Sequence, residues 1–151
     1  LSGPKYHVKD YIEGLNMLSN MRLCSNVLSQ HVVQTSLGGY QSVDELLLPG
    51  GRIYEQRNFI YKAINEIPGL SATKPKAGLY IFPKIDREMY RVDDDEQFVL
   101  DFLKQEKILL VHGRGFNWKD PDHFRIVYLP RVDELAQIQE KMTRFLRQYR
   151  R

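Results

Sequence analysis

Arg125 is the residue of this sequence that most strongly suggests chemistry. It lies in the apolar segment HFRIVYL, directly between Phe124 and Ile126. A guanidinium in such surroundings keeps its charge and needs an anion close by. Its planar fork matches a carboxylate through two parallel hydrogen bonds, so the residue is a candidate for binding an acid. From the residues alone, the commoner explanation is a structural ion pair with Asp or Glu, or an arginine on the polar side of a strand.

The segment HGRGFNW, which precedes that strand, is a second candidate for a ligand site. Gly113 and Gly115 would let the backbone approach a ligand closely, and Phe116 or Trp118 could cover that ligand. An ordinary glycine-rich turn explains the segment equally well, and its spacing fits neither type of phosphate-binding loop. Tyr80, in the run GLYIFP, could face a pocket, although packing in the core is the simpler interpretation.

Other residues that often carry chemistry show no useful pattern. The four histidines, His7, His31, His112 and His123, lack the spacing of metal ligands, so we expect no metal site. Cys24 has no setting that would activate a thiol, and we expect it to be buried. The serine motif of the hydrolases is missing from the sequence, so no complete set of catalytic residues is visible.

Helices and short strands must hold these residues in place. Apolar residues at steps of three and four indicate amphipathic helices, and short apolar runs bounded by proline or glycine indicate strands. The predicted helices span 5–22, 26–37, 42–48, 52–66, a segment that follows Asp93–Asp95, and 132–149. The predicted strands span 70–74, 78–83, 108–111 and 124–129, and the first two are joined as in a hairpin through 75–77. We therefore expect an α/β chain (α+β-like) with a four-stranded small sheet and helices packed on one face.

Composition limits the class of protein. The 151 residues suffice for one domain or two, and 42% apolar and 27% charged residues are ordinary for a folded chain. A net charge of +3 and the lack of a long apolar run make us expect neither a nucleic acid nor a membrane as partner. The single cysteine indicates a reducing compartment. The first residues do not resemble a signal peptide. Because the chain begins with Leu1 and not with Met, we expect it to be a piece of a longer protein.

Several segments together resemble a known family. In order, GGRIYEQRN, KAGLYIFPKI, QEKILLVHGRGFNW and HFRIVYLPRVDEL resemble the C-terminal part of the fold-type I pyridoxal-phosphate aminotransferases. The upstream run MRLCSNVLSQHVVQTSLGGYQS resembles more particularly the bacterial glutamate–pyruvate (alanine) aminotransferases. The likeness covers essentially the whole chain.

The resemblance implies a division of the chain into two parts. Residues 1–40 would be the last helices of an incomplete large domain that binds the cofactor, and 41–151 would be the small C-terminal domain. The cofactor of the intact enzyme would be pyridoxal 5′-phosphate. Its attachment lysine would lie upstream of Leu1, so we expect no catalytic and no cofactor-binding residue in this chain.

The resemblance also assigns roles to individual residues. Arg125 matches the family's arginine that grips the α-carboxylate of the substrate, and His112 departs from the residues usual before the loop glycine. Tyr80, Gly113, Phe116 and Gln30 match positions at the rim of the site.

The intact protein would therefore be a cytoplasmic homodimer that transfers an amino group between alanine and 2-oxoglutarate, with amino acids and 2-oxo acids as substrates. The fragment alone would be inactive. One alternative is another enzyme of the same fold, such as an aspartate, branched-chain or aromatic aminotransferase or a carbon–sulfur lyase. An alternative of a different class is a stand-alone αβ module that is regulatory or binds RNA; the apolar stripes before residue 40 speak against it.

Overall fold

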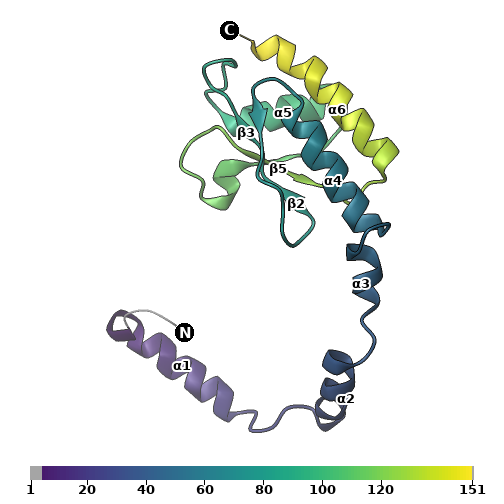
Figure 1. Ribbon diagram of the computed structural model, residues 1–151. Coiled ribbons are helices and arrows are strands. Elements are labelled where there is room, and N and C mark those ends of the chain that lie inside the picture. The colour runs from purple at the N-terminus through teal and green to yellow at the C-terminus, as the bar shows by residue number, and fades with distance from the viewer. Residues whose placement is uncertain (1–4, 151) are drawn as a thin grey trace. The chain divides into compact units, whose positions relative to one another are not determined.

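The computed structural model describes residues 5–150, and the chain divides into two compact units (Figure 1). The first unit ends at Ser42 and the second begins at Val43. Residues 1–4 of the first predicted part lie outside the described residues.

The first unit consists of helices without a core. A 3₁₀ turn, η1 (Lys5–Val8), leads into α1 (Lys9–Asn20), and α2 (Val27–Gly38) follows, as the apolar spacing predicted. Neither α1 nor α2 buries a residue, and Leu28 and Leu37 are 77% and 79% exposed. Cys24, between the helices, is exposed, so the expectation that it is buried was wrong.

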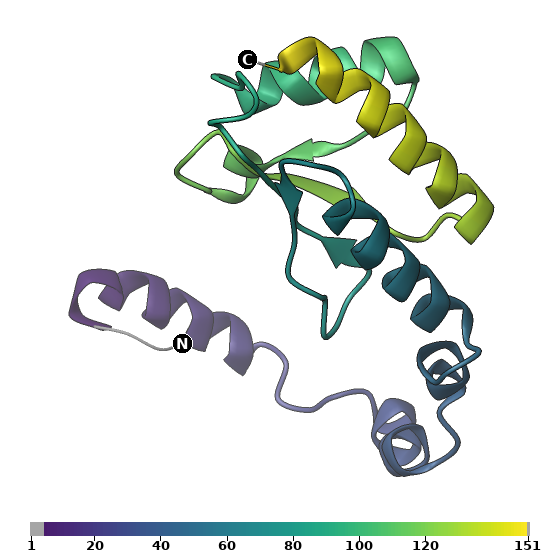
Figure 2. The same cartoon turned by 45° about the horizontal axis from the view of Figure 1, so that its top comes forward.

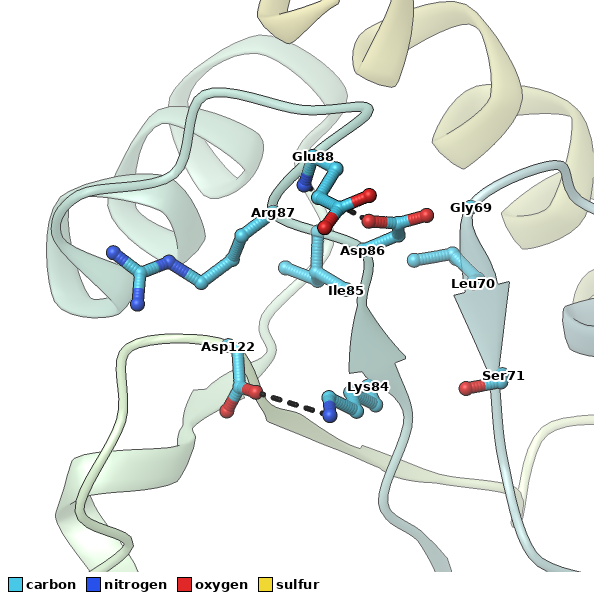
Figure 3. Close-up of a pocket in the computed structure, with 9 residues that line it drawn as sticks. All are labelled: Gly69, Leu70, Ser71, Lys84, Ile85, Asp86, Arg87, Glu88 and Asp122. Atoms are coloured by element: carbon cyan, nitrogen blue, oxygen red, sulfur yellow. Dashed lines mark hydrogen bonds and ion pairs between the residues drawn. The ribbon is translucent and has the colours of Figure 1, made fainter.

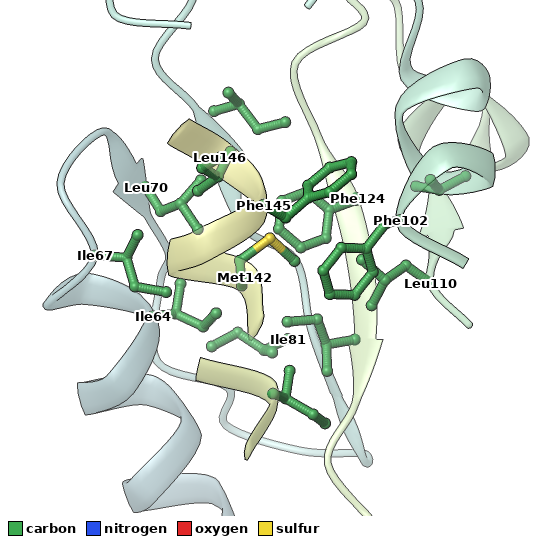
Figure 4. Packing of buried hydrophobic residues seen from close by; sticks show 14 of the residues in the cluster. Ile64, Ile67, Leu70, Ile81, Phe102, Leu110, Phe124, Met142, Phe145 and Leu146 are labelled. Atoms are coloured by element: carbon green, nitrogen blue, oxygen red, sulfur yellow. The ribbon is translucent and has the colours of Figure 1, made fainter. Parts of the chain in front are cut away.

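Helices of the second unit carry most of its buried surface. They are α3 (Ser42–Leu47), α4 (Arg52–Asn65), α5 (Asp95–Glu106), α6 (Val132–Leu146) and the 3₁₀ turn η3 (Arg147–Tyr149). Ile60 and Ile64 of α4 and Met142 and Phe145 of α6 are fully buried, because residues three or four apart share one helix face. Figure 4 shows Met142 and Phe145 among the side chains of this core. The predicted helices of this unit are therefore confirmed.

Within residues 5–150, five short strands form two antiparallel sheets. The strands are β1 (Leu70–Ser71), β2 (Tyr80–Ile81), β3 (Lys84–Ile85), β4 (Val111–His112) and β5 (Phe124–Val127). β1 pairs with β3, and the second sheet has the order β2-β5-β4. The α/β class is confirmed, but the four-stranded sheet is not, since the strands divide into a pair and a triplet.

The predicted hairpin between 70–74 and 78–83 was wrong. Leu70 pairs with Ile85, and Tyr80 pairs with Val127 instead. Pro83 interrupts the apolar run at 80–85, because it has no N–H to donate to a ladder. The two halves of the run therefore become β2 and β3, each with its own partner. The strand expected at 108–111 is also shorter, since ladder pairing there begins only at Val111.

The two faces of the β2-β5-β4 sheet differ in character. Phe124, Ile126 and Tyr128 are buried on the face that meets the core. Their neighbours His123 and Arg125 point to the opposite face, because successive side chains of a strand alternate. The helices α4, α5 and α6 lie on the core side (Figures 1 and 2), which leaves the second face for a ligand. Within residues 5–150, no helix is both long and apolar enough to span a bilayer.

Candidate functional site

Arg125 lies on the strand β5 with its guanidinium between two aromatic rings. Its backbone is fixed by pairing with Val111 of β4, and its flanking residues Phe124 and Ile126 are buried in the core. The carbon Cζ lies 4.4 Å from the ring centroid of Tyr80 and 4.3 Å from that of Phe116. Rings on the planar guanidinium leave its N–H groups, which point outward in the plane, free to donate.

Arg125 forms no ion pair within residues 5–150, and its Nε is buried without a hydrogen-bond partner. From the sequence alone, an internal ion pair was the commoner explanation for Arg125. The described part of the structure does not contain such a pair. A buried donor without an acceptor costs free energy, and an anion that binds there would remove that cost. The arrangement fits a ligand carboxylate, which can accept two N–H bonds from one guanidinium.

The residues named as a possible rim fall into two groups. Tyr80 and Phe116 meet at Arg125 and are half-exposed, at 49% and 44%. Gly113 begins the turn that carries Phe116, and its N–H donates to the carbonyl of His123 at 2.8 Å. Gln30 belongs to α2 of the first unit, where its side chain donates to the carbonyl of Ser25, so its place at the rim stays a prediction.

The turn η2 (Gly113–Phe116) is fastened to the start of α5. The fully buried carboxylate of Asp95 accepts the backbone N–H of Arg114 at 2.9 Å and a hydrogen bond from the Arg114 side chain. Asp94, the N-cap of α5, accepts a further bond from Arg114. Burial raises the pKa of Asp95, but the hydrogen bonds from Arg114 outweigh burial and hold it below the ordinary value.

His112 also faces this carboxylate, with Nδ1 3.8 Å from Asp95 Oδ2 and no hydrogen-bond partner within residues 5–150. Sequence reasoning missed the role of Asp95, because an acidic run before a helix is explained by the helix dipole alone.

A second network closes the other end of the loop. Asp122 Oδ1 accepts bonds from Trp118 Nε1 at 2.9 Å and from His123 Nδ1 at 2.6 Å. The His123 ring stacks on Phe82, whose centroid is 4.8 Å away. Burial raises the pKa of Asp122, but the bonds from His123 and Trp118 hold it below its usual range. The segment that carries Phe116 is thus held at both ends.

The larger cavities lie elsewhere in the second unit. One of about 520 Å³ opens between β1 and β3, where Lys84 and Asp122 form an ion pair at 3.8 Å (Figure 3). Its neighbour Asp86 accepts the N–H of Glu88, so three of the charged side chains there, Lys84, Asp86 and Asp122, already have partners. Another cavity, of about 570 Å³, is lined by Arg52, Gln56 and Arg131. Neither cavity contains Arg125, whose buried Nε lacks a partner within residues 5–150.

Neither a metal nor the expected cofactor fits these residues. Within 5–150 no three His, Cys, Asp or Glu side chains come together as a metal site. Pyridoxal 5′-phosphate needs a lysine for its aldehyde, whereas the groups against Arg125 are the rings of Tyr80 and Phe116. These residues fit a ligand carboxylate, and the rings against Arg125 offer no amine for the aldehyde of the cofactor.

Comparison with known proteins gives close relatives over the whole chain. The chain is 59% identical over 149 residues to the glutamate-pyruvate aminotransferase of Escherichia coli (strain K12). The aligned region covers 99% of this chain and 37% of the relative. The chain is also 53% identical over 150 residues to the alanine aminotransferase of Mycobacterium tuberculosis (strain H37Rv), with 99% and 35% covered. The chain thus spans little more than a third of the length of these relatives. No family model matches it.

Solved structures agree with these relatives. An aminotransferase from Escherichia coli superposes with a TM-score of 0.80 at 58% identity, over 100% of this chain and 37% of that one. An alanine aminotransferase from Pyrococcus furiosus superposes with a TM-score of 0.70 at 36% identity, over 96% and 36%.

Proposed function

The chain belongs to the aminotransferase family, and on that premise we propose that it supplies the substrate-carboxylate site of an enzyme that transfers an amino group between alanine and 2-oxoglutarate. The observation that carries the proposal is the guanidinium of Arg125, which lies between two rings and whose buried Nε has no hydrogen-bond partner in the part of the chain that the structure describes. Both substrates carry the α-carboxylate that this group fits. The names of the relatives support this substrate pair, since amino transfer from glutamate to pyruvate is the same reaction in the reverse direction.

Each residue at the site has a definite part in substrate binding. Arg125 donates two parallel N–H bonds to the α-carboxylate, which fixes the position and the plane of the substrate. Tyr80 and Phe116 hold the guanidinium flat and keep water from its faces, which strengthens the charge–charge attraction. Pairing between β4 and β5 fixes the backbone under Arg125, so little ordering is needed when the substrate arrives.

The reaction itself depends on parts of the protein outside these residues. Pyridoxal 5′-phosphate is the proposed cofactor, and when bound it supplies the electron sink of transamination. In this proposal residues 1–40 are the last helices of a large domain that holds the cofactor, and 41–151 form the small domain. The leucines of α2 and α3 are exposed. Helices rarely leave such apolar faces in water, which supports a further part of the protein that covers them. A cytoplasmic homodimer is the proposed form of the intact enzyme, with Gln30 at the rim of its site.

A change of Arg125 tests the proposal. Arg125→Lys in the full-length enzyme keeps the charge but loses the bidentate fork. We expect kcat/KM to fall for both alanine and 2-oxoglutarate. The fall should correspond to a loss of about 2–5 kcal/mol of binding free energy, which is the cost typical of a broken buried charge pair. Such a loss is a factor of about thirty or more. Steady-state kinetics with each substrate varied measure it.

Arg131→Lys is the matched control. Arg131 is exposed and lies 3.7 Å from Asp133, so the same substitution there should leave the kinetics unchanged. Equal kinetics of the two variants would remove Arg125 from the site. A panel of amino donors and 2-oxo acids on the wild-type enzyme would separate alanine from aspartate, branched-chain or aromatic substrates, since Arg125 serves all of them alike.

A further inference from the structure

We propose that Asp95 is a positioning residue for the substrate carboxylate, and that it acts through Arg114 and the turn η2 to hold Phe116 against the guanidinium of Arg125. The inference rests on the proposed function, because it concerns the same carboxylate site. Asp95 does not touch the substrate in this account. It fixes one wall of the site.

The two walls of the site are held in different ways. Tyr80 belongs to β2, and its backbone pairs with Val127 of β5, so the sheet that carries Arg125 also fixes this ring. Phe116 belongs to a four-residue 3₁₀ turn, and the bond from the Gly113 N–H to the His123 carbonyl holds the turn three residues before this ring. The position of the Phe116 ring therefore depends on what fastens the turn.

Inside the turn the fastening comes from one buried carboxylate, whereas Asp122 holds Trp118 just after the turn. Asp95 is fully buried at the first residue of α5, and it binds both the backbone N–H and the side chain of Arg114, nineteen positions further along the chain. Arg114 stands two residues before Phe116. Loss of the Asp95 contact frees the middle of the turn and, with it, the wall over Arg125.

Another charged pair on α5 provides a comparison within the same molecule. At the far end of the helix, Glu106 accepts bonds from Arg144 Nη2 at 2.6 Å and from Nε at 3.2 Å. This pair joins α5 to α6 instead of to the turn. Both pairs couple a half-exposed arginine to a buried carboxylate, so they differ mainly in whether they reach Phe116.

The experiment compares Arg114→Ala with Arg144→Ala in the full-length enzyme. If the turn keeps Phe116 in place only a tenth of the time, the apparent affinity of the enzyme for its substrate falls about tenfold. We expect the KM for alanine and the KM for 2-oxoglutarate to rise together by about that factor in Arg114→Ala, with a smaller change in kcat. Arg144→Ala should leave both KM values unchanged. Both substitutions of Arg114 keep its backbone N–H, so Arg114→Lys, which also keeps the charge, should recover part of the loss.

Hydrogen exchange gives a readout that does not depend on activity. Amide exchange of peptides covering 113–118 should accelerate in Arg114→Ala and stay at the wild-type rate in Arg144→Ala. Phe116→Leu serves as a second variant if Arg114→Ala does not fold, because it removes the half-exposed ring and leaves the Asp95 contact intact. It should raise both KM values as well.

The outcomes separate the two proposals. Equal KM values in Arg114→Ala and Arg144→Ala, or a normal KM in Phe116→Leu, would overturn the role of Asp95 while a loss in Arg125→Lys still upheld the proposed function. Normal kinetics in Arg125→Lys would overturn the proposed function, and the positioning role with it. Faster exchange at 113–118 without any change in KM would show a purely structural anchor and would also reject the inference.

Discussion

The arginines of the second unit differ in what surrounds them. Arg114 and Arg144 each bind a buried carboxylate of α5, so their charge serves the fold. Arg125 lies against the rings of Tyr80 and Phe116 and has no ion pair within residues 5–150. A cation held without its anion is costly to keep unless a ligand supplies that anion. This contrast within one molecule is the physical reason to place the substrate at Arg125.

Gly113 is a further residue on which the site depends. A Cβ at this position would lie 2.8 Å from the carbonyl oxygen of His123 and 3.0 Å from its Cβ, and the backbone of a paired strand cannot easily move away. We expect Gly113→Ala to destabilise the chain by about 2 kcal/mol, as is typical when a packed site is overfilled. The midpoint of urea unfolding measures the change.

Gly115→Ala is the control for that prediction, because the atoms nearest to its Cβ would be those of the His112 ring, at 3.3 Å and beyond. A side chain can turn aside, so this variant should unfold at nearly the wild-type urea concentration. A Gly113→Ala midpoint equal to that of Gly115→Ala would mean that the contact between Gly113 and His123 is not tight in solution.

Elements of this chain were predictable to different degrees. The helices followed directly from apolar residues at steps of three and four, since that spacing reports which face is buried. Strand pairing was not predictable in the same way. Ladder partners such as Leu70 with Ile85 depend on contacts distant in the sequence. From the sequence, Pro83 marked the end of a strand, whereas in the structure the chain changes its pairing partner there.

The candidate site shows the same limit. Arg125 could be singled out because a charge inside an apolar strand is conspicuous, and its likeness to a family position strengthened the prediction. The anchor at Asp95 could not, because its partner Arg114 lies nineteen residues away and nothing local marks the pair. Its acidic neighbours Asp93 and Asp94 made the residue look like an ordinary helix start.

The junction of α5 and η2 should depend on pH through Asp95. Its pKa in the folded chain is held below the ordinary value, so its contribution to stability is complete above the unfolded value of about 3.9. The contribution is lost as the pH falls from there through the folded pKa. We expect wild type to be more stable than Asp95→Asn at pH 6, and the difference to shrink below about pH 4.

Urea unfolding at a series of pH values measures this difference. Asp93→Asn is a suitable control, because Asp93 is exposed and its ion pair is with the exposed Arg91, at 3.4 Å. A gap between wild type and Asp95→Asn that stayed constant down to pH 2 would contradict the prediction.

At the scale of the whole molecule, the two units differ in how they bury apolar surface. The buried cluster of the second unit lies entirely between Ile53 and Leu146. The helices α1 and α2 bury none of their described residues, although they carry leucines and valines. Hydrophobic burial is the main stabilising contribution to folding, so the second unit has its own source of stability and the first does not.

Removal of the first helices should therefore leave the core intact. We expect a chain of residues 41–151, which keeps α3 whole, to unfold at the same temperature as the full 151 residues and to bind less of the dye ANS, which reports exposed apolar surface. Met142→Ala in the shortened chain checks the sensitivity of the measurement, because deleting a fully buried side chain should cost about 2–5 kcal/mol. A shortened chain that lost its cooperative transition would show that α1 and α2 stabilise the second unit, and the boundary proposed at residue 41 would then be wrong.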